Sequence, residues 1–143
     1  MTIMAQTIAR LTATKEATGL KLVAGAAEYS ALKGPPPRHA QPAAYALPTV
    51  DRARKNELIG KHRQRVDRGF SVVLALGNLA DARGENASVA MAAVEDLVAR
   101  QLAGWRPADT MDVVQFGGAR TLGLQDQVLW RQLDFTVPTI LQP

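Results

Sequence analysis

One long segment in the middle of the sequence constrains the fold more than any other feature. Between Gln64 and Asn78, apolar side chains fall at even-numbered positions, namely Val66, Phe70, Val72, Leu74 and Leu76. Alternation with a period of two is typical of a strand that buries one face. We therefore expect a long central strand over residues 61–76, in a protein built around a sheet.

Other periodic segments predict the elements around this strand. Apolar residues at helical spacing predict helices over 2–16 and 87–105, and two helical turns over 26–33. Further strands are predicted over 20–24, 43–47, 113–124 and 128–137. Because strands follow one another directly at the end of the chain, antiparallel pairing is favoured. The predicted fold class is α+β, a largely antiparallel sheet of four to five strands with two main helices packed on one face.

The helix over 87–105 has the clearest helical pattern. Its apolar residues form a wide face, and Glu95, Asp96 and Arg100 are expected on the opposite side. Asp96 and Arg100 are four residues apart, in the order that favours an ion pair along a helix. Asn86 and Ser88 both suit the start of this helix as capping residues.

Turn and loop signals separate the predicted elements. A length of 143 residues is appropriate for one domain, over 1–143. Residues 48–60 are polar and predict a mobile, exposed loop, which is a candidate for function. Gly117-Gly118 forms either a hairpin turn or a bulge within one bent strand. Pro138 is expected to end strand pairing, leaving 138–143 as a loose tail.

The sequence contains no recognisable chemical site. It has no cysteine, and its two histidines, His39 and His62, have no carboxylate or second histidine at metal-ligand spacing. A glycine-rich phosphate loop is also absent. We therefore predict no catalytic residue, no cofactor and no metal, and a protein that is not an enzyme. No apolar run approaches the roughly 20 residues that span a bilayer, so a membrane is not expected as a partner.

Two features remain as candidate interaction sites. The first is the basic run at the start of the long strand, Lys61, Arg63 and Arg65, continued by Arg68. It is either a solvated strand end that resists aggregation, or a contact with carboxylates of a neighbouring subunit, or a contact with phosphate. The net charge of +4 is compatible with each of these interpretations.

The second feature is Trp130, which alternation places on the strand face opposite Leu129 and Leu133. A helix of the same chain covers it, or it lies at an oligomer interface, where tryptophan is enriched. The candidate subunit or partner interface therefore comprises Lys61, Arg63, Arg65, Arg68, Trp130, Arg131, Arg52, Arg54 and Lys55.

The succession of motifs resembles the tail terminator (tail completion) family of tailed bacteriophages. The matching segments are Arg-Gln-Arg-Val at 63–66, Phe-Ser-Val-Val-Leu-Ala-Leu-Gly-Asn at 70–78, Asp-Ala-Arg-Gly at 81–84, Leu-Ala-Gly-Trp at 102–105, Phe-Gly-Gly-Ala-Arg-Thr-Leu-Gly-Leu-Gln-Asp at 116–126, and Val-Leu-Trp-Arg-Gln-Leu-Asp-Phe at 128–135. The resemblance extends from about Leu20 to Val137. These motifs consist of structural residues and carry no chemical signature.

The resemblance implies a structural virion protein, assembled in the host cytoplasm and located at the head-proximal end of the tail. Such a subunit forms a homo-oligomeric ring, expected to be a hexamer, that caps the tail tube and ends its polymerisation. Its implied partners are the major tail tube protein, a head-completion or connector protein, and phage DNA passing through the lumen without sequence-specific binding. The alternative is a small basic nucleic-acid-binding module.

Overall fold

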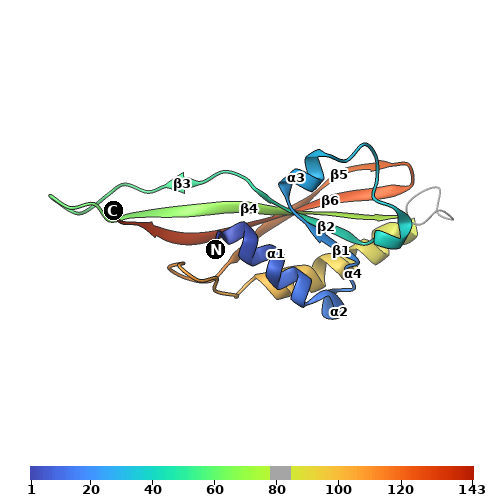
Figure 1. Ribbon diagram of the computed structural model, residues 1–143, viewed down its shortest axis with the longest axis horizontal. Coiled ribbons are helices and arrows are strands. Elements are labelled where there is room, and N and C mark those ends of the chain that lie inside the picture. Colours follow the sequence, from blue (N-terminus) through green and yellow to red (C-terminus); the bar gives the residue numbers. More distant parts are fainter. Residues whose placement is uncertain (78–84) are drawn as a thin grey trace.

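The computed structural model describes residues 1–77 and 85–143. Its central element is β4 (Gln64–Gly77), which pairs antiparallel with β6 (Val128–Leu141) from Gln64 opposite Leu141 to Gly77 opposite Val128 (Figure 1). The long strand predicted from alternation is therefore confirmed, although it begins at Gln64 instead of Lys61. The capping predicted for Asn86 lies outside the described side chains.

The sheet has six strands in the order β1-β2-β4-β6-β5, with β3 paired to β4 off this path. The strands not yet bounded are β1 (Leu22–Ala24), β2 (Ala43–Pro48), β3 (Arg52–Ala53) and β5 (Gln115–Gln125). Within residues 1–77 and 85–143, only β1 and β2 pair in parallel. The α+β class and the largely antiparallel sheet are confirmed. The predicted four to five strands become six, because β3 lies inside the segment expected to be a loop.

A two-residue hairpin and a bulge shape the last part of the sheet. Asp126 and Gln127 connect β5 to β6 with φ of 51° and 63°, the left-handed backbone that a tight hairpin turn requires. The pairing shifts register between Phe116 and Gly118, where Gly118 has φ 138°. Gly117-Gly118 is therefore a bulge within one strand, and the hairpin alternative is wrong.

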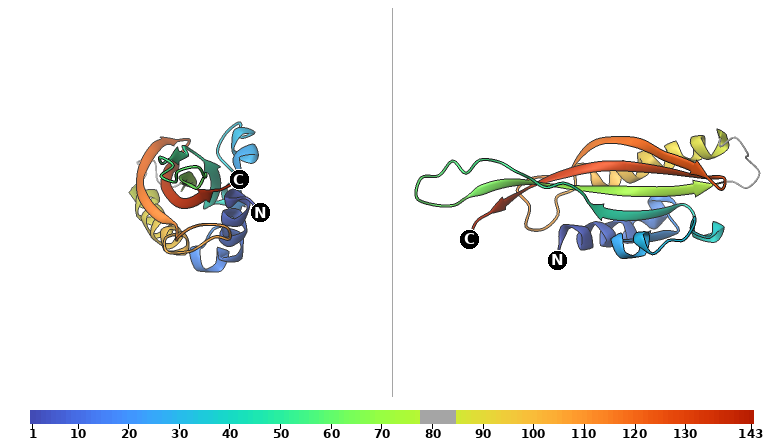
Figure 2. Two further views of the ribbon diagram at one scale, coloured as in Figure 1. Left: turned by 90° about the vertical axis from the view of Figure 1, so that its left-hand side faces the viewer. Right: turned by 90° about the horizontal axis from the view of Figure 1, so that it is seen from above.

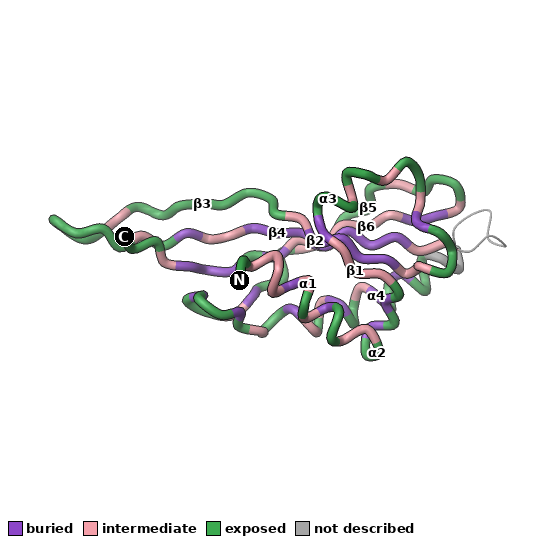
Figure 3. Tube along the Cα trace, viewed as in Figure 1, coloured by how far each residue is buried: buried purple, intermediate pink, exposed green. Residues whose placement is uncertain are grey.

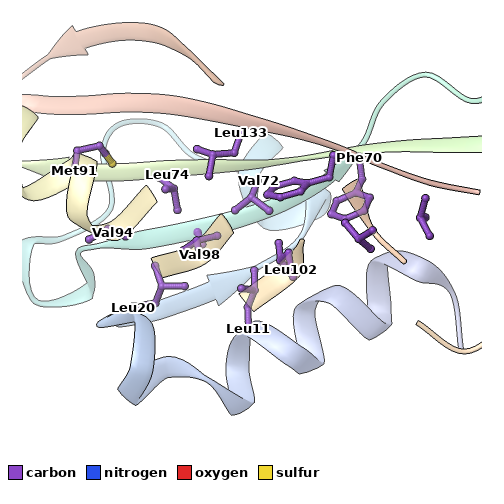
Figure 4. Close-up of a cluster of buried hydrophobic side chains, with 14 of the residues drawn as sticks. Leu11, Leu20, Phe70, Val72, Leu74, Met91, Val94, Val98, Leu102 and Leu133 are labelled. Carbon is purple, nitrogen blue, oxygen red and sulfur yellow. The ribbon is translucent and has the colours of Figure 1, made fainter. Parts of the chain in front are cut away.

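One face of the sheet is covered by α1 (Ile3–Ala13) and α4 (Glu85–Leu102) (Figure 4). The fully buried members of this cluster include Leu11, Phe70, Val72, Leu74, Val98, Leu102, Leu133 and Phe135. The rings of Phe70 and Phe135 stack with centroids 5.3 Å apart. The even-numbered face of β4 is thus the core, as alternation predicts. Among residues 1–77 and 85–143, no helix is long and apolar enough to cross a bilayer.

The N-terminal part of the chain contains further short helical elements. The predicted first helix is divided into α1 and α2 (Lys15–Thr18), and Gly19 ends α2 with φ 81°. Glycine adopts this left-handed conformation without strain, which explains its place after a helix. A single 3-10 turn, η1 (Arg38–Ala40), follows the proline run.

The opposite face of the sheet is covered by α3 (Ala26–Ser30), which packs a second cluster. Its Tyr29 lies against Tyr45 and Trp130, with ring centroids 5.5 and 6.3 Å away. The hydroxyl of Tyr45 is buried and has no hydrogen-bond partner among the described residues, and burial raises its pKa. One of the two interpretations of Trp130 is therefore observed, since α3 of its own chain covers it in part.

Two ion pairs formed by charged residues of α4 differ in their exposure to solvent. Arg100 donates from Nε to Oδ2 of Asp96 at 2.8 Å, so the predicted ion pair along the helix is confirmed. Glu95 was expected on the solvent side, and that prediction is wrong. Its Oε1 accepts from Arg131 Nε at 2.7 Å, and both side chains are mostly buried, because Glu95 lies at the border of the helix face that meets the sheet.

Candidate assembly interface

A narrow extension of the sheet projects from the packed part of the molecule (Figures 1 and 2). We call it the arm and define it as residues 49–68 together with 136–141. Residues 49–55 and 57–63 are exposed, in contrast to the buried residues 43–46 of β2 and 69–75 of β4 (Figure 3). The remainder of the chain is called the body. The arm contains most of the interface residues predicted from the sequence.

Backbone pairing gives the arm its structure. Gln64–Arg68 of β4 pair with Val137–Leu141 of β6, and β3 pairs on the other side, with Arg52 opposite Asp67 and Ala53 opposite Val66. The predicted loop over 48–60 therefore includes paired strand residues. We conclude that a hydrogen-bonded ladder supports the arm, together with the buried side chains of Val66, Val137 and Pro138.

Pro138 lies within this ladder, opposite Asp67. The prediction that it ends strand pairing is wrong. β5 pairs only as far as Thr136, so β6 is an edge strand beyond that point. The Pro138 carbonyl accepts from the Met111 amide at 2.8 Å, on the side away from β4. The missing N–H of Pro138 points the same way, and proline is tolerated in such an edge position.

Asp67 of β4 forms two ion pairs in the arm, one with Arg65 of the same strand and one with Arg54, which follows β3. Its Oδ1 accepts from Arg65 Nε at 2.8 Å, and its Oδ2 accepts from Arg54 Nε at 3.1 Å. The hydrogen bond from Arg65, with a smaller contribution from Arg54, lowers the pKa of this carboxyl group. Asp67 is therefore ionised over the whole neutral range and neutralises part of the charge of the two arginines.

The base of the arm is fixed by a second ion pair and by the close approach of residues 49–50 to Gly69 of β4. Arg68 donates from Nη1 to Oδ2 of Asp51 at 3.0 Å and from Nε to Oγ1 of Thr139 at 3.3 Å. Gly69 has no room for a Cβ, which would meet the Val50 carbonyl oxygen and lie 2.8 Å from Thr49 Oγ1. Between β2 and β3 the chain thus runs beside Gly69 at a distance that only glycine permits.

The tip of the arm is organised by Asn56. Its Nδ2 donates to the carbonyl oxygens of Leu58 at 3.3 Å and Lys61 at 2.9 Å, and its Oδ1 accepts from the Arg63 amide at 3.1 Å. The chain reverses at Gly60, whose φ is 73°. Lys61–Arg63 therefore belong to this turn and not to the strand, which corrects the predicted strand start. They have no strand partner because β6 ends its pairing opposite Gln64.

The arm carries the whole net charge of the protein. Residues 49–68 contain seven basic and three acidic side chains, and the other residues contain ten of each. Arg54, Arg65 and Arg68 are paired as described above. Arg52, Lys55, Lys61 and Arg63 form no ion pair with any residue in 1–77 or 85–143. These four residues are called the free arm cations.

The structure places the other two predicted interface residues in the body. Trp130 is half-buried beneath α3. Arg131 binds Glu95 and also donates from Nη1 to Oγ1 of Thr121 at 2.8 Å. Arg131 therefore joins α4 to the sheet within one chain.

Sequence reasoning missed the residues that order the arm and its tip. Asp51, Asn56 and Asp67 supply the acceptors described above. Leu58 and Ile59 are 45% and 100% exposed, and they are adjacent aliphatic residues at the arm's end. Two aliphatic residues followed by glycine in a polar segment were the available signal for this tip.

The described residues contain no group of three or more His, Asp or Glu side chains that could hold a metal ion. The fold is α+β, and the candidate site is the exposed surface of the arm. The sequence matches the family described as "Phage tail terminator protein" over residues 3–143. The chain therefore belongs to the phage tail terminator family, a family of structural proteins of the virion tail.

A solved structure provides a second comparison. A chain of the "Virion of native gene transfer agent (GTA) particle" aligns with a TM-score of 0.57 at 13% identity, covering 97% of this chain and 95% of that chain. At this identity the likeness demonstrates a shared fold. No curated protein matches the sequence significantly.

Proposed function

We propose that the chain is a single-domain subunit of a homo-oligomeric ring, with six copies, at the head-proximal end of the tail. The ring caps the tube of the major tail protein, ends its polymerisation, and presents a docking surface to a head-completion or connector protein. Phage DNA passes through its lumen without sequence-specific contacts. The residues that we assign to subunit or partner contact are those of the arm.

The observation that carries this proposal is the structured arm, whose exposed residues 49–55 and 57–63 project beyond the hydrophobic core (Figure 1). The arm is ordered by Asp51, Asn56 and Asp67, so it can bind without a large loss of conformational freedom. Its free arm cations are available for acidic groups of another chain. Electrostatic complementarity of this kind steers association and selects partners.

Polymerisation of the tail tube protein from the same particle, with and without this chain, tests the proposal. We expect shorter tubes with a cap at one end in electron micrographs, and a mass for the cap that corresponds to six subunits. Tubes of unchanged length without bound caps would contradict the proposal. A monomer in the absence of tube protein would not, because the tube end can act as the template for the ring.

The free arm cations also favour a second candidate, a module that binds nucleic acid through phosphate. Binding of this kind weakens steeply with salt as counterions are released. The arm residues 49–68 contain no Phe, Trp or Tyr on which bases could stack, and the nearby Phe70 is buried in the core. Titration of a fluorescent duplex at two salt concentrations separates the two functions. Tight binding that is lost when Arg52 and Arg63 become Glu would favour this second candidate.

A further inference from the structure

The end of the body farthest from the arm contains a pocket to which the proposed function assigns no role. It has a volume of about 740 Å³ and lies between α3 with the proline loop and the β5–β6 hairpin end. Its apolar lining comes from both sides, with Leu32 on one and Leu122 and Leu124 on the other, and Trp130 between them. We call it the hairpin pocket. A volume of several hundred Å³ is in the range of pockets that enclose a ligand or a few side chains.

Parts of this pocket are exposed apolar surface. Leu122 and Leu124 are 44% and 46% exposed, although they lie on a strand beside an aromatic cluster. Trp130 stacks on Tyr45 with ring centroids 6.5 Å apart, which gives the pocket a rigid aromatic support. Rigid aromatic groups within a pocket are typical of the energetic centre of a protein interface.

The arm tip presents aliphatic side chains that suit this apolar lining. Ile59 is fully exposed, and Leu58 beside it is nearly half exposed. Asn56 and the left-handed Gly60 hold these side chains on a closed turn. An ordered turn with two aliphatic side chains loses little freedom when it enters a pocket.

Charges at the two surfaces also match. Glu57 precedes the aliphatic pair and Lys61 follows it, while Lys33 lines the pocket and Asp126 lies in the hairpin next to the pocket residue Gln125. None of these four side chains forms an ion pair with another described residue. Glu57 facing Lys33 and Lys61 facing Asp126 would give two opposite-charge contacts around an apolar centre. Such a rim of charges around buried aliphatic anchors sets orientation.

The arm tip and the β5–β6 hairpin that lines the pocket lie at opposite ends of the elongated molecule (Figure 2). One chain cannot join them, but two copies can. A contact between different surfaces of identical subunits is heterologous, and it closes into a ring when the rotation between neighbours permits. We propose that the hairpin pocket of each subunit receives the arm tip, Leu58 and Ile59, of the next copy in the ring. This inference rests on the ring in the proposed function and specifies the contact that builds it.

Disulfide trapping tests the contact directly, since the chain has no cysteine of its own. Ile59→Cys and Leu122→Cys are prepared as separate proteins, mixed, and oxidised with and without tube protein. Both positions are exposed, so neither substitution removes a core side chain. We expect a covalent dimer in the mixture, and a ladder of multimers when one chain carries both substitutions. The matched control mixes Ile59→Cys with Val89→Cys, a 75% exposed position on α4.

The expected yield for the Leu122 mixture is about tenfold or more above the Val89 mixture, because docking raises the local thiol concentration. Equal yields in the two mixtures would overturn the inference. So would cross-linking of Ile59→Cys to the tube protein in place of Leu122→Cys.

A charge exchange between the two surfaces provides a second test. Glu57→Lys should reduce trapping, and adding Lys33→Glu in the partner chain should restore it. If Ile59→Asp still caps tubes like the unchanged protein, the inference fails while the proposed function stands. If the unchanged protein caps no tubes, the proposed function itself fails.

Discussion

The two halves of the β4–β6 ladder have continuous backbone pairing but very different side-chain environments. In the body half, Phe70, Val72 and Leu133 are completely or almost completely buried between the sheet and two helices. In the arm half, Val66 is buried, while Arg65 and the tip residues beyond it are exposed. The first half is stabilised mainly by apolar burial, whereas the second combines the buried side chains of Val66 and Val137 with ion pairs and amide hydrogen bonds.

This difference separates folding from assembly along one pair of strands. Burial of each large aliphatic or aromatic side chain contributes roughly 1.5–3 kcal/mol, whereas an exposed ion pair contributes at most about 1 kcal/mol. Substitutions in the arm should therefore leave the body folded.

The largest effect is expected from the body core. Leu133→Ala removes a fully buried side chain that packs against β4 and α4, and it should lower the free energy of unfolding by about 3 kcal/mol. Ile140→Ala, in the arm half of the same strand, should cost about 1 kcal/mol or less. Urea denaturation measures both. Similar losses for the two variants would show that the halves are not energetically distinct.

A smaller effect is expected where the halves meet. Gly69→Ala places a Cβ against the Val50 carbonyl and should cost roughly 2 kcal/mol, as overpacking does. Gly34→Ala is the matched control, because nothing lies within 4 Å of the added Cβ. Thermal unfolding of both variants tests this. Equal midpoints would mean that the chain around Gly69 shifts to make room for the added Cβ without loss of stability.

The arm's ion pairs should produce a modest dependence on pH. The pKa of Asp67 is lowered in the folded protein, so its stabilisation is present above the unfolded pKa of about 3.9 and is lost as pH falls through the folded value. Asp67→Asn should cost under about 1 kcal/mol at neutral pH and should reduce the acid-dependent loss. Unfolding curves measured between neutral and acidic pH provide the comparison. An unchanged pH profile in Asp67→Asn would contradict the assigned role.

The smallest effect on stability is expected at the arm tip. Asn56→Ala removes the acceptor of the Arg63 amide and both donors to the turn, while the body is untouched. Amide exchange at Arg63 should become faster, with global stability changed by no more than about 0.5 kcal/mol. Protection of the Arg63 amide that survives this substitution would show that Asn56 does not organise the tip.

Alternation in the sequence was sufficient to predict the body. Val72, Leu74 and Leu133 follow the period of a half-buried strand, and Met91, Val94 and Val98 follow that of a helix. These patterns mark the face that meets α1 and α4, so they are visible without a structure, although residues 69–75 of β4 are buried on both faces. The α+β class and the central strand followed from them directly.

The arm was less predictable, because no apolar pattern marks it. Pro138 was expected to end pairing, but whether a proline interrupts a strand depends on which side its missing donor faces. Asp67 and Asn56 are ordinary polar residues in sequence, and their roles depend on contacts with residues up to 13 positions away. The basic residues of the arm were identified from charge, whereas Arg131 could not be distinguished from them until its partner Glu95 was located.

The most direct test of the account reverses the charge of the free arm cations. Arg52, Lys55, Lys61 and Arg63 are replaced together by Glu, with Lys15, Lys21, Arg38 and Arg120, which lie outside both the arm and the hairpin pocket, as the matched body variant. For each protein, the unfolding midpoint and the capping of tail tubes are measured together. The account predicts that the arm variant folds like the unchanged protein but no longer caps tubes, while the body variant loses less. An arm variant that caps tubes normally, or that fails to fold, would contradict the separation of folding from assembly.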